Sequence, residues 1–568
     1  MSNYRLLLKN ATVVDGTGNP WYRASVGVVN GMITEVGDIT SADADEVVDV
    51  RGMILCPGFV DMHGHSDYQI IANPTADNKV LQGITTEFAG ECGYSAAPLR
   101  DNWFQEWWVE DPFQRFSVTS LDEGREVLKR HGIVSDWADF DEYLAVVEDA
   151  KPSVNYCTFV GHVALRVAAT GDYLRPPTVQ ELMEMKGLLK NSISHGAFGF
   201  STESGTHRKM DLPSSELEEM FGLCAQCGGR VGYHLKDYGD RAIEALQYGL
   251  DLISRTKVRT VLSHLCVDGM ENWGKADYVL SLIDEARAQG AEVWGDVMPY
   301  PSSGEALFYS PYAVHMLPDW VAQLAPGHVS DVLSMPESRL RLRGELAEGK
   351  ASSFYYVGRS DEGEAYGRGP LADPLWAHYV RIVESKVPGI EDRSVHDIAK
   401  DWGKDPLEVL LDVIQQDPGT KKLINRSSDE DKRALISHRL IGFGTDGGLV
   451  GAIRRPGIAN PTLYAVFPYV LRKFVVEEEL LPLEEMVRKM TSLPCVAHGI
   501  TDRGLIRPGY WADLVVFDPA AISPNVSYDE KMPMPVANGI SLVIVNGEIT
   551  VRDGTHTGAR AGRVIRYQ

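Results

Sequence analysis

Two histidines stand one residue apart at the end of an apolar, strand-like run, in the stretch FVDMHGHSD that covers residues 59–67. Side chains at positions i and i+2 of a strand point to the same side, so His63 and His65 face the same way. A single buried histidine is usually a hydrogen-bonded part of a core, whereas two at this spacing can hold one metal ion. The pair alone leaves both interpretations open, and the ends of the other strand-like runs must decide between them.

Those other runs end in residues of the same chemical kind. They contribute Glu91, Cys92, His162, Glu203, His234, His264 and Asp446. Packing explains any one of these residues, but it explains poorly why so many strand ends carry imidazole, thiolate or carboxylate. This mixture suits zinc, with manganese, iron or cobalt as alternatives. Because a divalent ion lowers the pKa of a bound water from about 15.7 toward about 7, we expect His63 and His65 to be metal ligands in a site that generates hydroxide.

The elements that must position these residues alternate between short β-rich runs and amphipathic helical stretches, which is typical of a parallel sheet with crossover helices. Eight candidate strands begin near residues 58, 84, 154, 197, 230, 258, 291 and 440. Eight β/α units predict an α/β fold of the (β/α)8 type, a TIM-like barrel. Active sites of such barrels lie at the carboxyl ends of the strands, where the candidate ligands stand.

Both ends of the chain predict strands of a second, smaller domain. Residues 24–38 and 541–554 are alternating runs joined by Asn-Gly, a strong hairpin signal, and residues 512–519 add another strand. We expect residues 1–57 and 503–568 to form one small β domain, with the barrel at 58–502 inserted between its halves. Residues 301–439 are far more than one crossover needs, so about 303–370 are expected to form an inserted, lid-like subdomain.

Composition and charge narrow the class of protein. The 568 residues are 44% hydrophobic and 24% charged with a net charge of −24, which is typical of a globular protein and unfavourable for a nucleic-acid or anionic-membrane surface. The amino-terminal stretch is too polar for a signal peptide, and no apolar run is long enough for a membrane helix. Seven scattered cysteines favour a reduced, cytoplasmic location, and the pair Cys224 and Cys227 fits helix packing. We expect a small-molecule substrate, and a homo-oligomer is compatible with the sequence.

Several motifs along the chain resemble, in order, those of a known family. They read PGFVDMHGHSD, GECGYSAAPL, HLKDYGD, SHLCVDGMENWGKA, GTDGG, MTSLPCVAHGITDRGLIRPGYWADLVVFDP and TGARAGRVIR. Together they resemble the amidohydrolase superfamily and, more closely, the N-acyl-D-amino-acid deacylases (D-aminoacylases). The likeness spans nearly the whole chain and implies the same barrel, composite β domain and late insertion.

The resemblance also implies roles for single residues. Cys92, His234 and His264 would hold one tightly bound Zn²⁺, and the Cys92 thiolate would bridge where many relatives use a carboxylated lysine. His63 and His65 would belong to a second, weaker or vacant metal position. Asp446 would touch the metal and act as the acid/base, taking a proton from the attacking water and passing it to the departing nitrogen. His162 would either donate to the substrate carbonyl or serve packing.

The differences from the family concern the substrate. Glu91 stands where relatives often have asparagine, and Glu203 stands where glycine is usual. Two cations and one phenol are exchanged for Cys266, Thr462 and Met298, which weakens binding of a substrate carboxylate by several kcal/mol. We expect Glu203, Cys266 and Tyr300 to line the pocket. Arg454 and Arg455 either restore anion binding from a new direction or are ordinary exposed arginines.

These observations predict a metal-dependent hydrolase of a C–N amide bond in a small molecule that differs from ordinary N-acyl-D-amino acids. A more neutral or cyclic amide fits the pocket better. The same metal chemistry also serves a lactone, cyclic imide, carbamate or urea. A non-catalytic relative that acts as a scaffold would lack ligands, whereas every ligand position that the resemblance implies is filled.

Overall fold

The computed structural model places most of the chain. It describes residues 4–39, 44–100, 102–104, 118–130, 132–172, 174–203, 212–238, 241–269, 272–300, 302–307, 317–322, 324, 326–347, 358–359, 365–366, 375–425, 427–449, 461–526 and 536–568. Among these residues no helix is both long and apolar enough to cross a membrane.

A closed barrel of parallel strands forms the centre of the molecule. Its strands are β6 (Phe59–Asp61), β7 (Ile84–Ala89), β10 (Asn155–Thr158) continued by β11 (Val160–Gly161), β12 (Gly199–Ser201), β13 (Arg230–Tyr233), β14 (Arg259–Leu262), β15 (Val293–Val297) and β22 (Ile441–Phe443). Successive strands pair in parallel from β6 round to β22. The first and last strands meet through the Met62 amide on the Phe443 carbonyl (3.1 Å) and the Asp446 amide on the His63 carbonyl (2.8 Å). All eight predicted strands are confirmed, and so is the TIM-like barrel.

Helices cover the outside of the barrel. They are α1 (Gln69–Ala72), α2 (Asp77–Val80), α3 (Leu121–Arg130), α4 (Phe140–Ala150), α5 (His162–Thr170), α6 (Val179–Ser194), α7 (Ser214–Gln226), α8 (Ala242–Thr256), α9 (Ala276–Ala288), α16 (Asp429–Ser437), α17 (Val466–Val470), the π-helix η5 (Leu471–Glu477), α18 (Leu483–Met490) and α19 (Ser492–His498). Local sequence fixes several helix starts: α4 and α6 both begin with a capping box, from Asp139 and Glu142 and from Thr178 and Glu181.

Strands from the two ends of the chain form one sheet. They are β1 (Tyr4–Val13), β2 (Tyr22–Val29), β3 (Met32–Gly37), β4 (Ala44–Asp49), β5 (Ile54–Pro57), β23 (Leu514–Phe517), β24 (Ile540–Val545), β25 (Glu548–Arg552) and β26 (Thr555–His556). Chain segments far apart in sequence meet where β5 pairs with β23. The two predicted Asn-Gly turns have positive φ at both residues, 50° and 80° at Asn30 and Gly31 and 48° and 82° at Asn546 and Gly547, as type I′ hairpins require.

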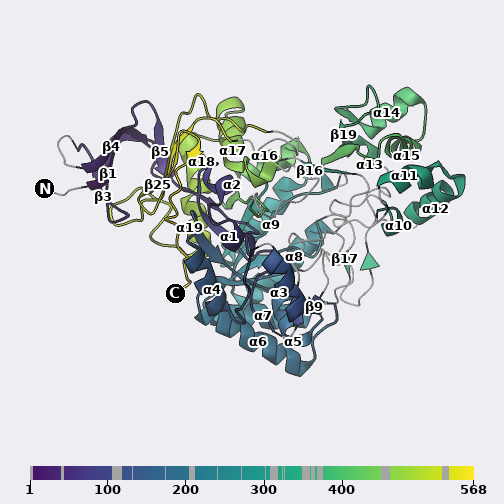
Figure 1. Ribbon diagram of the computed structural model, residues 1–568, viewed down its shortest axis with the longest axis horizontal. Helices are drawn as coiled ribbons and strands as arrows, with labels where there is room; N and C mark the ends of the chain where they lie inside the picture. Colours follow the sequence, from purple (N-terminus) through teal and green to yellow (C-terminus); the bar gives the residue numbers. More distant parts are fainter. Residues whose placement is uncertain are drawn as a thin grey trace.

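The long connection between β15 and β22 has a core of its own. It contains β16 (Ser302–Leu307), α10 (Asp319–Ala322), α11 (Pro326–Ser334), α12 (Pro336–Ala347), β17 (Gly358–Arg359), β18 (Ala365–Tyr366), α13 (Trp376–Tyr379), β19 (Val380–Glu384), β20 (Arg393–Ser394), α14 (Val395–Trp402), α15 (Pro406–Gln416) and β21 (Lys421–Asn425). Its apolar cluster runs from Leu317 to Ile414, beyond the predicted interval of about 303–370. The terminal sheet and the α10–α15 region lie toward opposite ends of the long axis (Figure 1). The domain boundaries themselves remain a prediction.

Candidate metal centre

The predicted metal ligands meet at the carboxyl ends of the barrel strands. His63 and His65 follow β6, Cys92 follows β7, and Asp446 follows β22. His234 and His264 complete the group and follow β13 and β14. Parallel strands of a closed barrel bring their carboxyl ends to one rim, so residues from five strands gather in one place.

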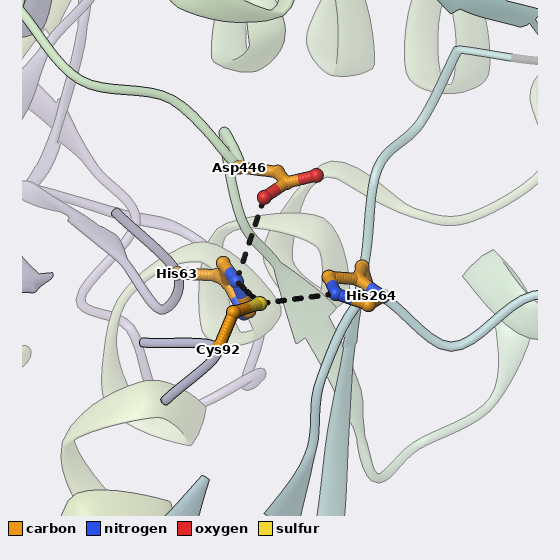
Figure 2. Close-up of side chains that lie close together, drawn as sticks. All are labelled: His63, Cys92, His264 and Asp446. Carbon is orange, nitrogen blue, oxygen red and sulfur yellow. Dashed lines mark hydrogen bonds and ion pairs between the residues drawn. The ribbon is translucent and has the colours of Figure 1, made fainter. Parts of the chain in front are cut away.

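The Cys92 sulfur lies at the middle of this group. It is 3.3 Å from His63 Nε2, 3.3 Å from His264 Nε2 and 3.3 Å from His234 Nδ1. One ligand atom each from His63, Cys92, His264 and Asp446 lies within 4.8 Å of all the others, and these four side chains point toward one another (Figure 2). A sulfur between imidazoles from both sides of the rim can bridge two metal positions.

Asp446 lies at the edge of the group. Its Oδ1 is 3.1 Å from His65 Nε2 and 3.6 Å from His63 Nε2. The Asp446 side chain is 27% exposed, whereas His63 is fully buried. Of these three side chains, Asp446 is therefore the one that a substrate arriving from solvent reaches most easily.

The backbone is strained at three of these positions. Cys92, His264 and Asp446 have φ values of 51°, 34° and 48°, in the left-handed region that residues other than glycine rarely adopt. Such conformations persist where the surrounding structure enforces them and are concentrated at functional sites. Here they aim three side chains from strand ends toward one point.

Other buried groups hold the ligands in place. Asp296 on β15 places Oδ2 3.5 Å from His63 Nδ1, and its Oδ1 accepts the His264 amide at 3.1 Å. A carboxylate behind a ligating histidine fixes the ring orientation and raises its basicity. The His234 amide donates to Thr202 Oγ1 at 3.0 Å.

The electrostatics of the group favour metal binding. Burial, aided by the charge of His63, lowers the pKa of His234 to about 3, so this imidazole is neutral, the form that binds metal. Burial raises the pKa of the Cys92 thiol to about 12, and a metal ion would replace its proton. Burial also opposes ionisation of Asp446, but the hydrogen bond from His65 and the charges of His264 and His63 hold the pKa of Asp446 well below its usual value. Imidazoles, a thiol and an ionised carboxylate together fit a borderline divalent cation such as zinc.

Glu91 lies beneath the group inside the barrel. Its side chain is 1% exposed, and a Cβ at Gly232 would lie 2.3 Å from its Oε2. Gly232 and His234 share one face of β13, so Glu91 occupies the space below His234 that the glycine leaves open. Burial raises the pKa of Glu91 to about 8. This carboxyl therefore fills the barrel interior below the ligands.

His162 lies apart from the metal group in the contacts that the structure describes. Its Nε2 is 2.7 Å from Glu216 Oε1, and Arg166 also binds the Glu216 carboxylate. The ring packs on Phe200 with the centroids 5.4 Å apart. This buried network ties α5 to α7 and favours packing over contact with a substrate, so a catalytic role for His162 rests on the resemblance alone.

The predicted substrate-binding residues lie in different surroundings. Glu203 is fully buried against the loop that carries Cys92, where a Cβ at Gly93 would be 2.5 Å from the Glu203 Cβ. Cys266 is partly buried close to Tyr238, whose ring centroid is 5.0 Å from those of both His234 and His264.

Tyr300 is stacked on another aromatic ring at the exit of β15. Its ring centroid is 4.2 Å from that of Tyr469, and its hydroxyl donates to the Ala465 carbonyl at 3.3 Å. Arg454 and Arg455 lie outside the described residues.

Sequence reasoning missed two residues that support the site. Asp296 could have been found, because a single carboxylate within the otherwise apolar run VWGDV is a signal in itself. Lys79 carries no such signal, since it stands in the polar stretch PTADNK and reaches the site only through the fold.

Comparison with known proteins identifies the family of this chain. The model of the amidohydrolase family matches residues 46–255 and 382–551, more than half of the chain. The chain belongs to the amidohydrolase family. An N-acyl-D-aspartate deacylase from Alcaligenes xylosoxydans xylosoxydans is 30% identical over 98% of this chain and 94% of its own length. An N-acyl-D-glutamate deacylase from the same organism is 29% identical over 99% and 96%.

Solved structures of deacylases have the same fold as this chain. The N-acyl-D-glutamate deacylase of Bordetella bronchiseptica, complexed with zinc and a phosphonate inhibitor that mimics the tetrahedral intermediate, has a TM-score of 0.71 at 28% identity, with both chains fully covered. A D-aminoacylase also has a TM-score of 0.71 at 28% identity, with 99% of this chain and 100% of that chain covered. Another D-aminoacylase structure contains a binuclear metal centre. This amidohydrolase is thus a metal-dependent enzyme of the D-aminoacylase type, from a family of hydrolases that act on C–N bonds.

Proposed function

We propose that this amidohydrolase cleaves the amide bond of a small, uncharged or cyclic substrate with the help of Zn²⁺. The observation that carries the proposal is the position of the Cys92 sulfur, 3.3 Å from each of three imidazole nitrogens, with the Asp446 carboxylate at the edge of the same group. Cys92, His234 and His264 would hold one ion. His63, His65 and Asp446 would form a second position, with Cys92 between the two.

A bound divalent metal supplies an activated water and polarises the carbonyl that is attacked. Asp446 accepts the proton of the attacking water: its lowered pKa keeps the carboxylate ionised, and its partial exposure leaves it within reach of solvent. It then passes this proton to the departing nitrogen. Asp296 holds His63 and the backbone of His264 in place throughout.

The surroundings of the site support a substrate without a free carboxylate. Lys79 contacts Asp61 and Glu87, and Lys236 lies over the Tyr248 ring at 4.1 Å. Cys266 and Thr462 add no positive charge. A substrate carboxylate would therefore meet the acidic groups near the metal without a described lysine or arginine directed at it from these positions.

A matched substrate panel tests the proposal. Zinc-loaded enzyme is assayed with N-acetyl-D-amino acids, their L-forms, the corresponding carboxamides, and a few lactones and cyclic imides. We expect the carboxamides or cyclic compounds to have the higher kcat/KM. A preference for the free acids of about tenfold or more, equivalent to about 1.4 kcal/mol, would contradict the uncharged substrate and would direct attention to Arg454 and Arg455.

A further inference from the structure

A fully buried lysine lies directly behind one half of the metal centre. Lys79, on the short helix α2, has no exposed surface. Its Nζ is 2.7 Å from Asp61 Oδ2 and 3.1 Å from Glu87 Oε1, and it also donates to the Thr445 hydroxyl (3.0 Å) and the Gly447 carbonyl (2.9 Å). Burial disfavours the charged form, but Asp61 and Glu87 outweigh it and raise the pKa of Lys79. The ammonium is thus charged and held on several sides.

The partners of Lys79 flank the ligands of the second metal position. Asp61 Oδ1 accepts the backbone N–H of His63 at 3.2 Å and that of Thr445 at 2.9 Å. Thr445 and Gly447 stand on either side of Asp446. The lysine and Asp61 therefore join the end of β6 to the end of β22, where His63 and Asp446 begin their turns toward the metal.

The contacts continue around the second histidine. The Ser66 hydroxyl donates to the Glu87 carboxylate, and the His65 amide donates to the Gly447 carbonyl at 3.1 Å. Lys79 therefore contacts Thr445 and Gly447, the two neighbours of Asp446 in sequence. Through Asp61 it is connected to the His63 amide, and through Glu87 to Ser66, the residue after His65. A Cβ at Gly64 would lie 2.2 Å from Glu87 Oε1, so the glycine between the two histidines is what lets Glu87 approach.

The other metal position has different supports. The His234 amide is held by Thr202, and the His264 amide is held by Asp296. In the contacts that the structure describes, neither of these supports is shared with Lys79. Asp296 touches both halves, because it also faces His63.

We propose that Lys79 is a positioning residue for the metal position formed by His63, His65 and Asp446, and that the position formed by Cys92, His234 and His264 does not depend on it. This inference rests on the proposed two-metal site but not on the identity of the substrate. A fixed charge between two carboxylates holds two strand ends in one register. Buried ion pairs are better known for fixing register in this way than for adding net stability.

The chain provides a matched control in Lys489 on α18. This lysine also has no exposed surface, and its Nζ donates to the carbonyls of His438 and Ile441. The His438 carbonyl lies before β22 and the Ile441 carbonyl lies at its start. In contrast, Lys79 binds Thr445 and Gly447, which lie after the end of β22. Replacing either lysine by methionine removes a buried amine beside the same strand, but of the two only Lys79 contacts residues next to the metal ligands.

The experiment is a Co²⁺ titration of metal-free wild type, Lys79→Met and Lys489→Met, followed by stoichiometry and by the thiolate-to-cobalt absorption from Cys92. We expect two equivalents for wild type and for Lys489→Met. For Lys79→Met we expect the second equivalent to bind at least about tenfold more weakly, while the first equivalent and the thiolate absorption are retained. Two equivalents bound as in wild type, or equal loss of both, would overturn the inference.

A milder variant covers the case in which Lys79→Met does not fold. Thr445→Val keeps the shape of the side chain and removes only its hydroxyl from the Lys79 contacts. It should weaken the second equivalent to a smaller degree, and an unchanged titration of this variant would count against the inference. A single equivalent in wild type would remove the second position and the inference with it. Failure of the substrate panel, in contrast, would leave the cobalt result standing and would refute only the proposed reaction.

Discussion

Two lysines without exposed surface lie at opposite ends of strand β22, and their surroundings give them opposite properties. Lys79, at the end that carries the metal ligands, binds Asp61 and Glu87, which raise its pKa. Lys489, at the other end, binds backbone carbonyls, and burial together with Arg488 lowers its pKa to about 7. The comparison teaches that burial alone does not decide the charge of a lysine. The partners also matter, and the lysine whose pKa is raised is the one beside the candidate metal site.

The largest effect on activity is expected for Asp446, whose two neighbours in sequence, Thr445 and Gly447, are bound by Lys79. Asp446→Asn should keep the fold and the ion at Cys92, His234 and His264 but lower kcat by about 10²–10⁴, because the substitution removes the proton acceptor. Steady-state kinetics on the best substrate of the panel measure this, with circular dichroism as a check of folding. Wild-type kcat in a folded Asp446→Asn enzyme would remove the acid/base assignment.

The next effect separates the two lysines by stability. Lys79→Met leaves Asp61 and Glu87 buried without their cation and should lower the free energy of unfolding by about 3–5 kcal/mol. Lys489→Met leaves two carbonyls without an amine donor, for which about 1–3 kcal/mol is expected. Urea unfolding of the metal-free variants gives both numbers. An equal loss in the two variants would mean that the carboxylates around Lys79 do not matter.

A smaller effect, on metal affinity, is expected for Asp296, which supports both metal positions. Asp296→Asn weakens the contact to His63 but can still accept the His264 amide, so metal affinity should fall by about 10–100-fold. Unlike Lys79→Met, Asp296→Asn should weaken binding of the first as well as the second equivalent of Co²⁺. The titration described for Co²⁺ distinguishes these patterns, and loss confined to the second equivalent would show that Asp296 serves only His63.

The last expected difference is a pH dependence of stability that has opposite sign for the two lysines. The pKa of Lys489 is about 7 in the folded protein and 10.5 for an ordinary lysine, so the unfolded state binds more protons between these values. Stability from this residue therefore rises with pH from 7 to 10.5, by at most about 1.4 kcal/mol per pH unit. The raised pKa of Lys79 contributes stability that is present below 10.5 and is lost only above it.

Unfolding measured from pH 7 to 9.5 checks this difference. Lys489→Met should have a shallower rise of stability with pH than wild type in this range. Lys79→Met should keep the wild-type slope, because Lys79 stays protonated in both states there. The reverse result would mean that the assignments of charge to the two lysines are exchanged.

The parts of the fold that local sequence controls could be predicted. The eight barrel strands are short buried runs between helical stretches, and the Asn-Gly turns impose their hairpins wherever they occur. The grouping of the ligands followed from the same reasoning, because His63, Cys92, His234, His264 and Asp446 each stand at a strand end and a barrel gathers those ends.

Contacts that depend on the direction of a side chain could not be predicted. Glu91 turns below the metal group because Gly232, on a different strand, leaves space for it. His162 stands at a strand end like the ligands, yet Glu216 on α7 binds it elsewhere. Lys79 joins residues that are far away in sequence, such as Gly447, and no local pattern announces such a contact.

The most direct test of the account is the zinc dependence of hydrolysis in wild type and Cys92→Ser. Both proteins are stripped with a chelator and then given Zn²⁺, and turnover of the best panel substrate is followed. The account predicts that stripped wild type is inactive and regains its rate with Zn²⁺, whereas Cys92→Ser regains little because the central sulfur is lost. An undiminished rate in the stripped wild type, or full recovery of Cys92→Ser, would contradict the proposal that metal at this thiolate supports the reaction.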